Sequence, residues 1–328
     1  MPGPLLVYRE DDIPLEPLAQ TLVTILGYGS QGKAQALNLR DSGVRVVVGA
    51  RRGKSYDAAH KDGFDVLLVT DAVAAADIVA ILVPDEVQGQ LFRDEVTSFL
   101  RDDALIIFAH GAAVHFKEIT PPPTCDVALV APMGPGTLLR SRYLQGQGLN
   151  AKVAVYRDVS GKAWPRVLAY ARALGCARAG VIATTFGEET RLDLFSEQSV
   201  LCAGIPALAE AAFETLVEAG YPPVLAYIEC VREVKYIADL MYEYGLEGMR
   251  QRISSSALFG GAEGARKLVT SDTRRALRHI LQEIQDGTFA ARMKREFPGR
   301  DVLLSQLRNN RLEDARAEYD KLLPQDEE

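Results

Sequence analysis

The feature that most restricts the fold of this chain is an apolar segment that runs directly into a glycine-rich turn. Residues 21–27, TLVTILG, have the apolar, β-branched composition of a buried strand, and G-Y-G-S-Q-G follows at 27–32. A helical pattern, GKAQALNLRDSG, then occupies residues 32–43. A strand, a G-x-G-x-x-G turn and a helix in this order predict the first βαβ unit of a dinucleotide-binding sheet.

The glycines of this turn have different tasks. Gly27 permits the tight turn, Gly29 lets the backbone approach a pyrophosphate, and Gly32 lets the helix pack against the strand. The phosphates then meet unpaired N–H groups at the helix N-terminus. The predicted cofactor residues of the turn are Gly27, Tyr28, Gly29, Ser30, Gln31 and Gly32. The alternative is a plain strand–turn–helix without a ligand, because the motif by itself is weak.

The first half of the chain alternates between apolar runs and helical patterns. Further β-rich runs lie at 44–50, 77–84, 104–110, 126–132 and 152–158. Such alternation predicts an α/β fold, a Rossmann-type doubly wound parallel sheet covered on both faces. From about Ala183 onward only long helical patterns follow. We therefore expect a dinucleotide-binding domain over residues 1–182 and an all-helical domain over 183–328.

The loop after the second predicted strand indicates which dinucleotide is bound. An NAD enzyme usually has an acidic residue there, which accepts from the ribose 2′-OH. This chain has Arg51, Arg52, Lys54 and Ser55 instead. Three cations and a hydroxyl suit a 2′-phosphate, so the sequence predicts NADPH. An exposed basic loop that is merely solvated is the alternative.

Two pairs of carboxylates stand out in the helical half. Asp193 and Glu197 are four residues apart, and so are Glu229 and Glu233. Residues at this spacing share one helix face, and both pairs lie among apolar residues, where carboxylates are rare without a partner. Two such helices face to face would offer oxygen ligands for one or two Mg²⁺ ions. A single pair of this kind would more often be a solvated helix face.

Composition and charge exclude several other classes of protein. The chain has 328 residues, 48% hydrophobic and 25% charged, with a net charge of −7, so nucleic acid is not an expected partner. We expect no membrane partner either, because there is no apolar run of eighteen residues and no signal-like start. The four cysteines are far apart, which predicts reduced thiols in a cytoplasmic protein.

Several longer blocks resemble those of one enzyme family. They include ILGYGSQGKAQALNLRDSGV, LVPDEVQ, FAHGAAVHF, VAPMGPGT, AGVIATTFGEETRLDLFSEQSVLCAG and RISSSALFG. With these blocks the chain resembles the short, class I form of ketol-acid reductoisomerase, the acetohydroxy acid isomeroreductase. The resemblance implies a knotted helical C-terminal domain and a homodimer with active sites shared between subunits. It is also compatible with a higher assembly of such dimers. It also implies a small-molecule substrate.

The resemblance also implies roles for individual residues. Two Mg²⁺ ions would be held by the family's four carboxylates, which match Asp193, Glu197, Glu229 and Glu233. Catalysis would involve His110, Asp193 and Glu233; for His110 alone, a structural histidine is the other possibility. The remaining expected contacts are Pro84, Asp85 and Gly136 with the cofactor, and Ser254 and Met133 with the substrate. In the implied reaction an alkyl group migrates and NADPH reduces the resulting 2-keto acid.

This chain departs from the family pattern at positions close to the chemistry. The family's turn A-P-K-G-P-G-H has Met133 in place of its lysine, and Leu258 replaces a carboxylate. The lysine is thought to bond the reacting oxygen, and a thioether can neither donate nor titrate. The departures favour a divergent reductase of a 2-keto acid, ketone or imine in a specialised pathway, with reduced or no alkyl migration. The alternatives are an ordinary ketol-acid reductoisomerase of valine and isoleucine biosynthesis and a silent dinucleotide-binding protein.

Overall fold

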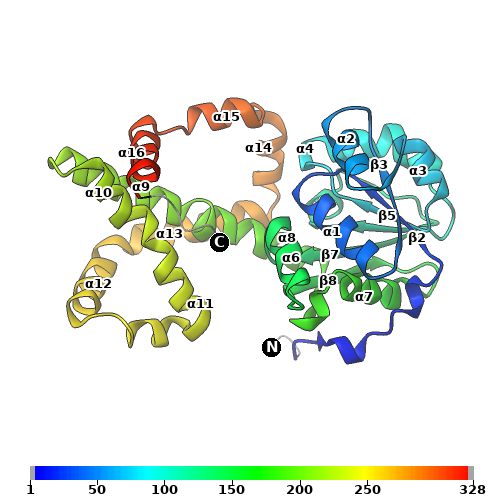
Figure 1. The fold of residues 1–328 in the computed structure, drawn as a ribbon, viewed down its shortest axis with the longest axis horizontal. Coiled ribbons are helices and arrows are strands. Elements are labelled where there is room, and N and C mark those ends of the chain that lie inside the picture. Colours follow the sequence, from blue (N-terminus) through cyan, green and yellow to red (C-terminus); the bar gives the residue numbers. More distant parts are fainter. Residues whose placement is uncertain (1–3, 324–328) are drawn as a thin grey trace. The chain divides into compact units, whose positions relative to one another are not determined.

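The chain forms two compact units, the first ending at Thr190 and the second beginning at Arg191. The computed structural model describes residues 4–323, and its elements are labelled in Figure 1. The first unit contains the glycine-rich turn and a sheet, and the second contains helices. The division falls inside helix α8 (Phe186–Ser196), so the first turn of α8 belongs to the first unit.

The first unit is built on a nine-stranded sheet with the order β1-β9-β8-β7-β6-β5-β2-β3-β4. The strands from β4 to β7 run parallel, whereas β8 pairs antiparallel with β7. The strands are β1 (Val7–Tyr8), β2 (Leu22–Leu26), β3 (Arg45–Gly49), β4 (Asp65–Leu67), β5 (Ile78–Ile81), β6 (Leu105–Phe108), β7 (Asp126–Pro132), β8 (Ala151–Arg157) and β9 (Val181–Ala183). The predicted Rossmann-type sheet is confirmed. The strands that the sequence missed, β1, β4 and β9, have two or three residues and hence no measurable periodicity.

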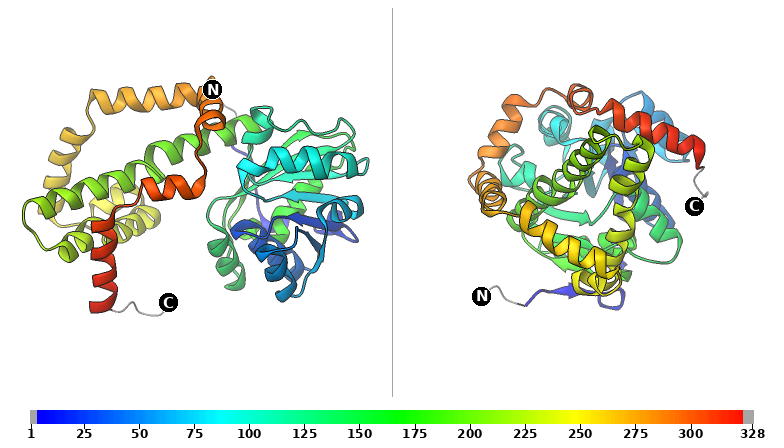
Figure 2. Two further views of the ribbon diagram at one scale, coloured as in Figure 1. Left: turned by 90° about the horizontal axis from the view of Figure 1, so that it is seen from above. Right: turned by 90° about the vertical axis from the view of Figure 1, so that its left-hand side faces the viewer.

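Helices cover both faces of this sheet, as Figures 1 and 2 show. One apolar core lies under α1, α2, α6 and α7, and a second lies under α3, α4 and α5. The bounds are α1 (Ser30–Asp41), α2 (Lys54–Lys61), α3 (Val69–Ala75), α4 (Asp85–Leu91), α5 (Ala112–His115), α6 (Gly136–Leu144) and α7 (Ala163–Ala173). Burial on both faces explains why the central strands are mostly apolar, as in β5 (IVAI) and β6 (LIIF), instead of alternating.

The second unit is helical throughout its described part. Its small core joins α9, α10 and α16 around Phe213 and Tyr227. The helices, coloured from green through yellow to red in Figure 2, are α9 (Gly204–Glu218), α10 (Pro223–Tyr227), α11 (Val234–Arg250), α12 (Ser255–Leu268), α13 (Ser271–Gln285), α14 (Thr288–Glu296), α15 (Arg300–Gln306) and α16 (Asn310–Leu322). The all-helical second part is therefore confirmed.

Large apolar side chains of the second unit are exposed in a single chain. Tyr242 is 84% exposed and Phe259 is 72% exposed, and many leucines resemble them. The helical segment Phe186–Glu218 is long and apolar enough to cross a membrane, by length and composition alone. Apolar side chains exposed in this number are typical of surfaces that contact other molecules.

Candidate active site

The turn between β2 and α1 has the geometry of a phosphate-binding loop. Gly27 has a φ of +96°, and a Cβ there would lie 2.8 Å from the Leu82 carbonyl oxygen. A Cβ on Gly32 would lie 2.0 Å from the Gly27 carbonyl oxygen. Both positions therefore need glycine, and the turn leaves the N-terminus of α1 open to an anion.

Tyr28 anchors this loop through a hydrogen bond to Asp62. The side chain is buried, and its hydroxyl donates to Asp62 Oδ2 across 2.9 Å. Lys33 Nζ lies 2.8 Å from the same oxygen. Burial, followed by the Asp62 bond, raises the pKa of Tyr28. The geometry thus gives Tyr28 a structural role in holding the loop, next to its predicted contact with the cofactor.

The Gly/Pro turn after β7 is docked on the same loop. Gln31 Nε2 donates to the Gly134 carbonyl across 2.8 Å, and the Gly136 N–H donates to Ser30 Oγ across 3.2 Å. A Cβ on Gly136 would lie 2.0 Å from the Ser30 carbonyl oxygen, so the approach depends on glycine. The structure therefore brings the predicted residues Ser30, Gln31 and Gly136 together. Met133, in this turn, is 52% exposed.

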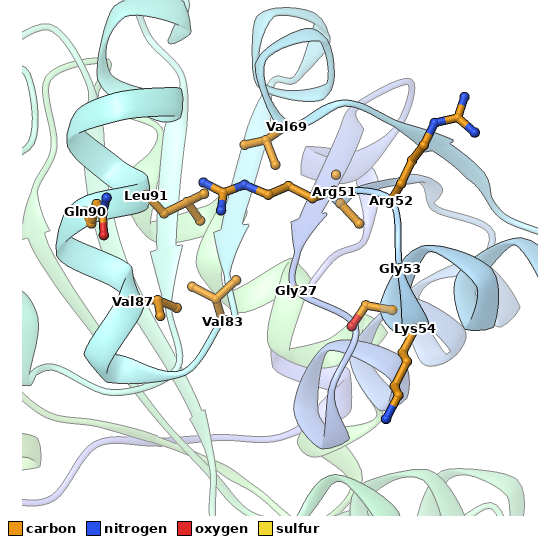
Figure 3. Close-up of a pocket in the computed structure, with 13 residues that line it drawn as sticks. Gly27, Arg51, Arg52, Gly53, Lys54, Val69, Val83, Val87, Gln90 and Leu91 are labelled. Carbon is orange, nitrogen blue, oxygen red and sulfur yellow. The ribbon is translucent and has the colours of Figure 1, made fainter. Parts of the chain in front are cut away.

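A pocket of about 400 Å³ lies beside Gly27 and contains the basic loop. Its lining includes Arg51, Arg52, Lys54 and Ser55, the residues that the sequence assigns to the cofactor. Apolar residues of the loop after β5 and of α4 form another part of the wall; they are Val83, Val87 and Leu91. Figure 3 shows the cations and the apolar side chains around this pocket. Pro84 and Asp85 form the start of α4, next to Val83.

The cations of the pocket have different environments. Arg51 forms an ion pair with Glu95, and this hydrogen bond raises the pKa of the guanidinium. In Figure 3 the Arg51 side chain extends toward Gln90 and Leu91, away from Lys54. The Arg52 guanidinium lies 5.9 Å from the Tyr56 ring centroid, a cation–π distance. Arg52 and Lys54 therefore stand apart from the Arg51–Glu95 pair.

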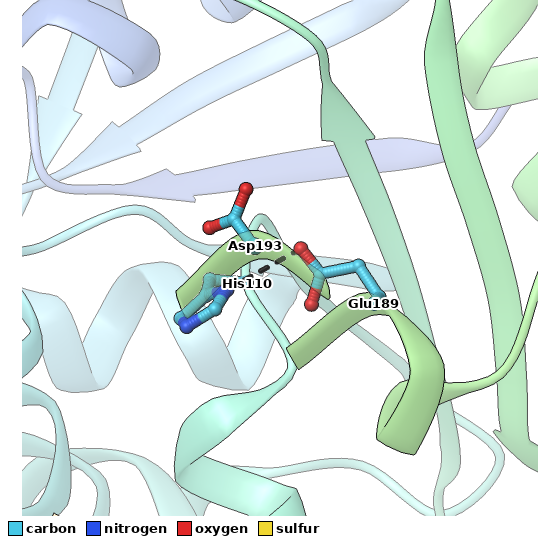
Figure 4. Close-up of side chains that lie close together, drawn as sticks. All are labelled: His110, Glu189 and Asp193. Carbon is cyan, nitrogen blue, oxygen red and sulfur yellow. Dashed lines mark hydrogen bonds and ion pairs between the residues drawn. The ribbon is translucent and has the colours of Figure 1, made fainter. Parts of the chain in front are cut away.

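A second polar group in the first unit surrounds His110. Its Nδ1 lies 3.3 Å from Glu189 Oε1, and the Gly111 N–H donates to Glu189 Oε2 across 2.8 Å. Because an ionised carboxylate only accepts, the Glu189 contact favours the tautomer with hydrogen on Nδ1. Figure 4 shows the imidazole beside both carboxylates of α8, Glu189 and Asp193. The contact gives His110 a fixed orientation, whichever role it has.

Asp193 follows Glu189 by one turn of the same helix. The ligand atoms of His110, Glu189 and Asp193 lie within 4.8 Å of one another, close enough to hold a metal ion. Glu189 accepts from the Gly111 N–H, and its other oxygen faces His110 and Lys152. Its carboxylate therefore already has three partners within the protein. Asp193 is the member that the sequence assigns to Mg²⁺.

The four predicted metal carboxylates lie at helix irregularities. Glu197 begins the π-helical turn Glu197–Leu201, and Asp193 lies one turn before it. Glu229 lies in the π-helical turn Ile228–Arg232, and Glu233 is the residue that follows this turn. Such turns recur at functional sites. Among residues 4–323 of one chain the four carboxylates do not gather into one cluster. A site shared between subunits, as the resemblance implies, needs no such cluster within a chain.

Ser254, the predicted substrate residue, is the N-cap of α12. Its Oγ accepts from the Ala257 N–H across 3.1 Å and lies 3.1 Å from Ser256 Oγ. This capping bond accounts for a serine here without any ligand. The hydroxyl can still donate to an anion at the helix N-terminus, so the substrate role stays a prediction.

Comparison with known proteins assigns the chain to a family. Residues 17–180 match the model "Acetohydroxy acid isomeroreductase, NADPH-binding domain". Residues 186–325 match "Ketol-acid reductoisomerase, C-terminal domain". The chain belongs to the ketol-acid reductoisomerase family. It is therefore an oxidoreductase with an NAD(P)-binding domain, as the sequence blocks predicted.

A solved ketol-acid reductoisomerase agrees with this assignment over the full length. It is the NADH-preferring enzyme from an uncultured archean, with 37% identity, a TM-score of 0.92, and coverage of 98% of this chain and 100% of that chain. Pyrroline carboxylate reductase of Plasmodium falciparum with NADP bound has 12% identity and a TM-score of 0.52, over 81% and 98% of the two chains. At that identity it shares only the fold.

Sequence reasoning missed two residues of the polar group around His110, Glu189 and Lys152. Glu189 is 1% exposed, and it extends the four-residue series 189, 193, 197 by one helical turn toward the N-terminus. That spacing was visible in the sequence. Lys152 Nζ lies 4.0 Å from Glu189 Oε1. No local pattern indicates this contact, because the two residues come from different elements 37 positions apart.

Proposed function

We propose that this chain catalyses the ketol-acid reductoisomerase reaction of branched-chain amino acid biosynthesis. A 2-hydroxy-3-keto acid is rearranged with Mg²⁺, and NADPH reduces the new 2-keto acid. The observation that carries the proposal is the full-length relationship to a solved ketol-acid reductoisomerase, at 37% identity over 98% of this chain. The comparisons support this reaction better than the divergent reductase that the sequence departures favour.

The side chains fit two divalent cations by their donor chemistry. Asp193, Glu197, Glu229 and Glu233 offer oxygen ligands, which Mg²⁺ prefers. Bound there, Mg²⁺ supplies Lewis acidity toward the substrate oxygens. The remaining tasks belong to the chain: Glu189 orients His110 beside Asp193. Ser254, at the N-terminus of α12, is expected to donate to the substrate carboxylate.

A reductase without alkyl migration is the second candidate, because Met133 stands where the family has lysine. Losing one well-placed donor typically raises a barrier by about 3 kcal/mol. Leu258, 44% exposed on α12, likewise replaces a carboxylate. Migration depends on proton handling more strongly than hydride transfer to a polarised carbonyl does.

One assay separates the two candidates. 2-Acetolactate and 3-hydroxy-3-methyl-2-oxobutyrate are supplied separately with NADPH and Mg²⁺. Turnover of both supports the ketol-acid reductoisomerase reaction. Turnover of the keto acid alone supports the reductase without migration. Turnover of neither substrate, with NADPH still bound, would contradict both candidates. The protein would then be a silent dinucleotide-binding protein or an enzyme for another substrate.

NADPH is the proposed cofactor, although the solved relative is NADH-preferring. Support comes from Arg52, Lys54 and Ser55, which line one pocket with Gly27. Charge-assisted hydrogen bonds from these groups would neutralise a 2′-phosphate, which NADH lacks. A higher kcat/KM with NADH than with NADPH would overturn this choice.

We further propose that a second copy of the chain covers the exposed apolar surface of the helical unit. The alternative, a membrane around Phe186–Glu218, conflicts with the position of its charges. The most apolar stretch of that segment, C-terminal to Glu197, contains Glu210 and Glu214, and both accept from Asn309 Nδ2. Carboxylates in hydrocarbon are costly, whereas a subunit interface can leave them in contact with polar partners. Sedimentation of the purified protein in the absence of detergent tests this proposal.

A further inference from the structure

Lys152 is a partly buried lysine close to the His110 cluster. Its side chain is 17% exposed, and Nζ lies 4.0 Å from Glu189 Oε1. The same carboxylate oxygen lies 3.3 Å from His110 Nδ1. Removing an ammonium group from water is costly, so a lysine with this little exposure is usually paired with an anion, here Glu189. The ammonium group thus faces the carboxylate that contacts His110, a residue to which the resemblance gives a catalytic role.

Strand pairing connects Lys152 with the position of the missing lysine. β7 and β8 are antiparallel with Ala131 opposite Lys152, and the Met133 N–H donates to the Asn150 carbonyl across 2.8 Å. Met133 directly follows the last residue of β7, so the bond to Asn150 continues the pairing by one position and the Gly134 N–H then turns back to the Pro132 carbonyl. Position 133 is therefore diagonal to Lys152 across the end of the strand pair, and such positions are about 7–8 Å apart, a distance that a long side chain can span.

We propose that Lys152 supplies the ammonium group that donates to the reacting substrate oxygen, in place of a lysine at position 133. This inference rests on the proposed reductive function. The nicotinamide of NADPH transfers hydride to the keto carbon, forming a C–H bond and NADP⁺. The carbonyl π pair moves to oxygen, and that oxygen takes a proton from the Lys152 ammonium group. The neutral amine then regains a proton from water.

Glu189 holds Lys152 and His110 in position in this arrangement. Its Oε2 is fixed by the Gly111 N–H, and its Oε1 faces both His110 and Lys152. Glu189 is thus a positioning residue, which holds two donors on one side of the substrate site. Met133, by contrast, supplies no hydrogen-bond donor. In this proposal Lys152, on the neighbouring strand β8, replaces the donor that position 133 lacks.

The test removes the lysine at position 152 and then introduces one at position 133, on the other side of the strand pair. The variants are Lys152→Met, Met133→Lys/Lys152→Met and, as a matched control for loss of one charge, Lys162→Met at an exposed position. With 3-hydroxy-3-methyl-2-oxobutyrate, K152M should lose about a hundredfold in kcat, with the Kd of NADPH and the Tm unchanged. The double variant should regain at least tenfold over K152M, and K162M should resemble the wild type.

Two outcomes overturn the proposal: a kcat of K152M within threefold of the wild type, or a loss that the double variant does not recover. A second measurement covers the case in which the wild type turns over neither substrate, which would defeat the proposed function itself. There the Kd of oxalate, an unreactive 2-oxo acid analogue, is measured with NADP⁺ and Mg²⁺ present. A tenfold rise in K152M alone supports the inference, and an unchanged Kd overturns it.

Discussion

The backbone N–H of Gly111 donates to Glu189 Oε2 across 2.8 Å, and the backbone at this point leaves no room for a side chain. A Cβ on Gly111 would lie 2.6 Å from Thr190 Oγ1 and 2.9 Å from the Phe186 carbonyl oxygen. The glycine that follows His110 thus lets α8 approach closely enough for its carboxylates to reach the imidazole. The contact joins the loop after β6 to the first turn of α8.

Gly111→Ala is therefore expected to destabilise the first unit and to displace Glu189. Overpacking of this kind typically costs about 1–3 kcal/mol, which should lower the Tm by several degrees. Thermal unfolding followed by circular dichroism measures this. Gly89→Ala, in α4, is the control, because its Cβ would meet the end of the Arg93 side chain at 3.4 Å and the Glu118 carbonyl oxygen at 3.9 Å, without overpacking. Equal Tm values for both variants would contradict the prediction.

Cofactor selectivity should depend on Arg52 and Lys54 more than on Arg51. Arg51 is engaged by Glu95, whereas Arg52 and Lys54 lie at the other end of the pocket. We expect Arg52→Ala/Lys54→Ala to lower kcat/KM for NADPH by tenfold or more, with little effect on NADH. The physical reason is the loss of charge-assisted hydrogen bonds, each about 1.5–3 kcal/mol, to the 2′-phosphate.

Steady-state kinetics with both cofactors measures this selectivity, and Arg51→Ala is the matched comparison. If Arg51→Ala abolished the preference for NADPH while the double variant kept it, the assignment of the two ends of the pocket would be reversed.

The sheet and the cofactor turn could be predicted from the sequence because their signals are local. The run TLVTILG and the glycines at 27, 29 and 32 are adjacent in the chain, and the structure places them in β2 and the turn before α1. Strands β1 and β9 gave no such signal. They are two and three residues long and depend on pairing with each other across the sheet edge.

The polar cluster around Glu189 was only partly predictable. His110 came from a resemblance, and Asp193 from a four-residue spacing that could have been extended to Glu189. Lys152 could not be found in this way, because its position depends on the register of β7 against β8 and on where α8 begins. Long-range contacts of this kind are properties of the assembled fold. A single lysine in an apolar strand pattern therefore gives no indication of its contact with Glu189.

The pairing of Asp62 with Lys33 and Tyr28 predicts a pH-dependent stability. The hydrogen bond from Lys33 holds the pKa of the Asp62 carboxyl below its usual value. The pairing therefore stabilises the fold above the unfolded-state pKa, about 3.9, and is lost as pH falls through the lower folded-state pKa. We expect Asp62→Asn to lower the Tm at pH 7, and the difference from the wild type to shrink below about pH 4.

Thermal scans across that pH range measure the difference, with the exposed Asp102→Asn as control. A Tm difference that stays constant down to pH 3.5 would mean that Asp62 acts through packing and not through its charge.

The exposed helical unit predicts that two defective chains can together form an intact site. If each site takes Asp193 and Glu197 from one subunit and Glu229 and Glu233 from the other, Glu197→Gln and Glu229→Gln each disable every site of a homodimer. In a mixed dimer both substitutions fall in one site, and the other site keeps all four carboxylates. Removing a metal ligand should otherwise abolish turnover, because the Lewis acid is then misplaced or absent.

Co-expression of the two variants with different affinity tags provides the mixed dimer without unfolding the chains. Random pairing makes half of the dimers mixed, so about a quarter of all sites should be intact, with a matching kcat per site. Two differently tagged copies of Glu197→Gln provide the control and should stay inactive. Were each site instead built within one chain, every site of the mixed dimer would contain one substitution. The co-expressed pair would then be as inactive as the control, which would rule out carboxylates shared between subunits.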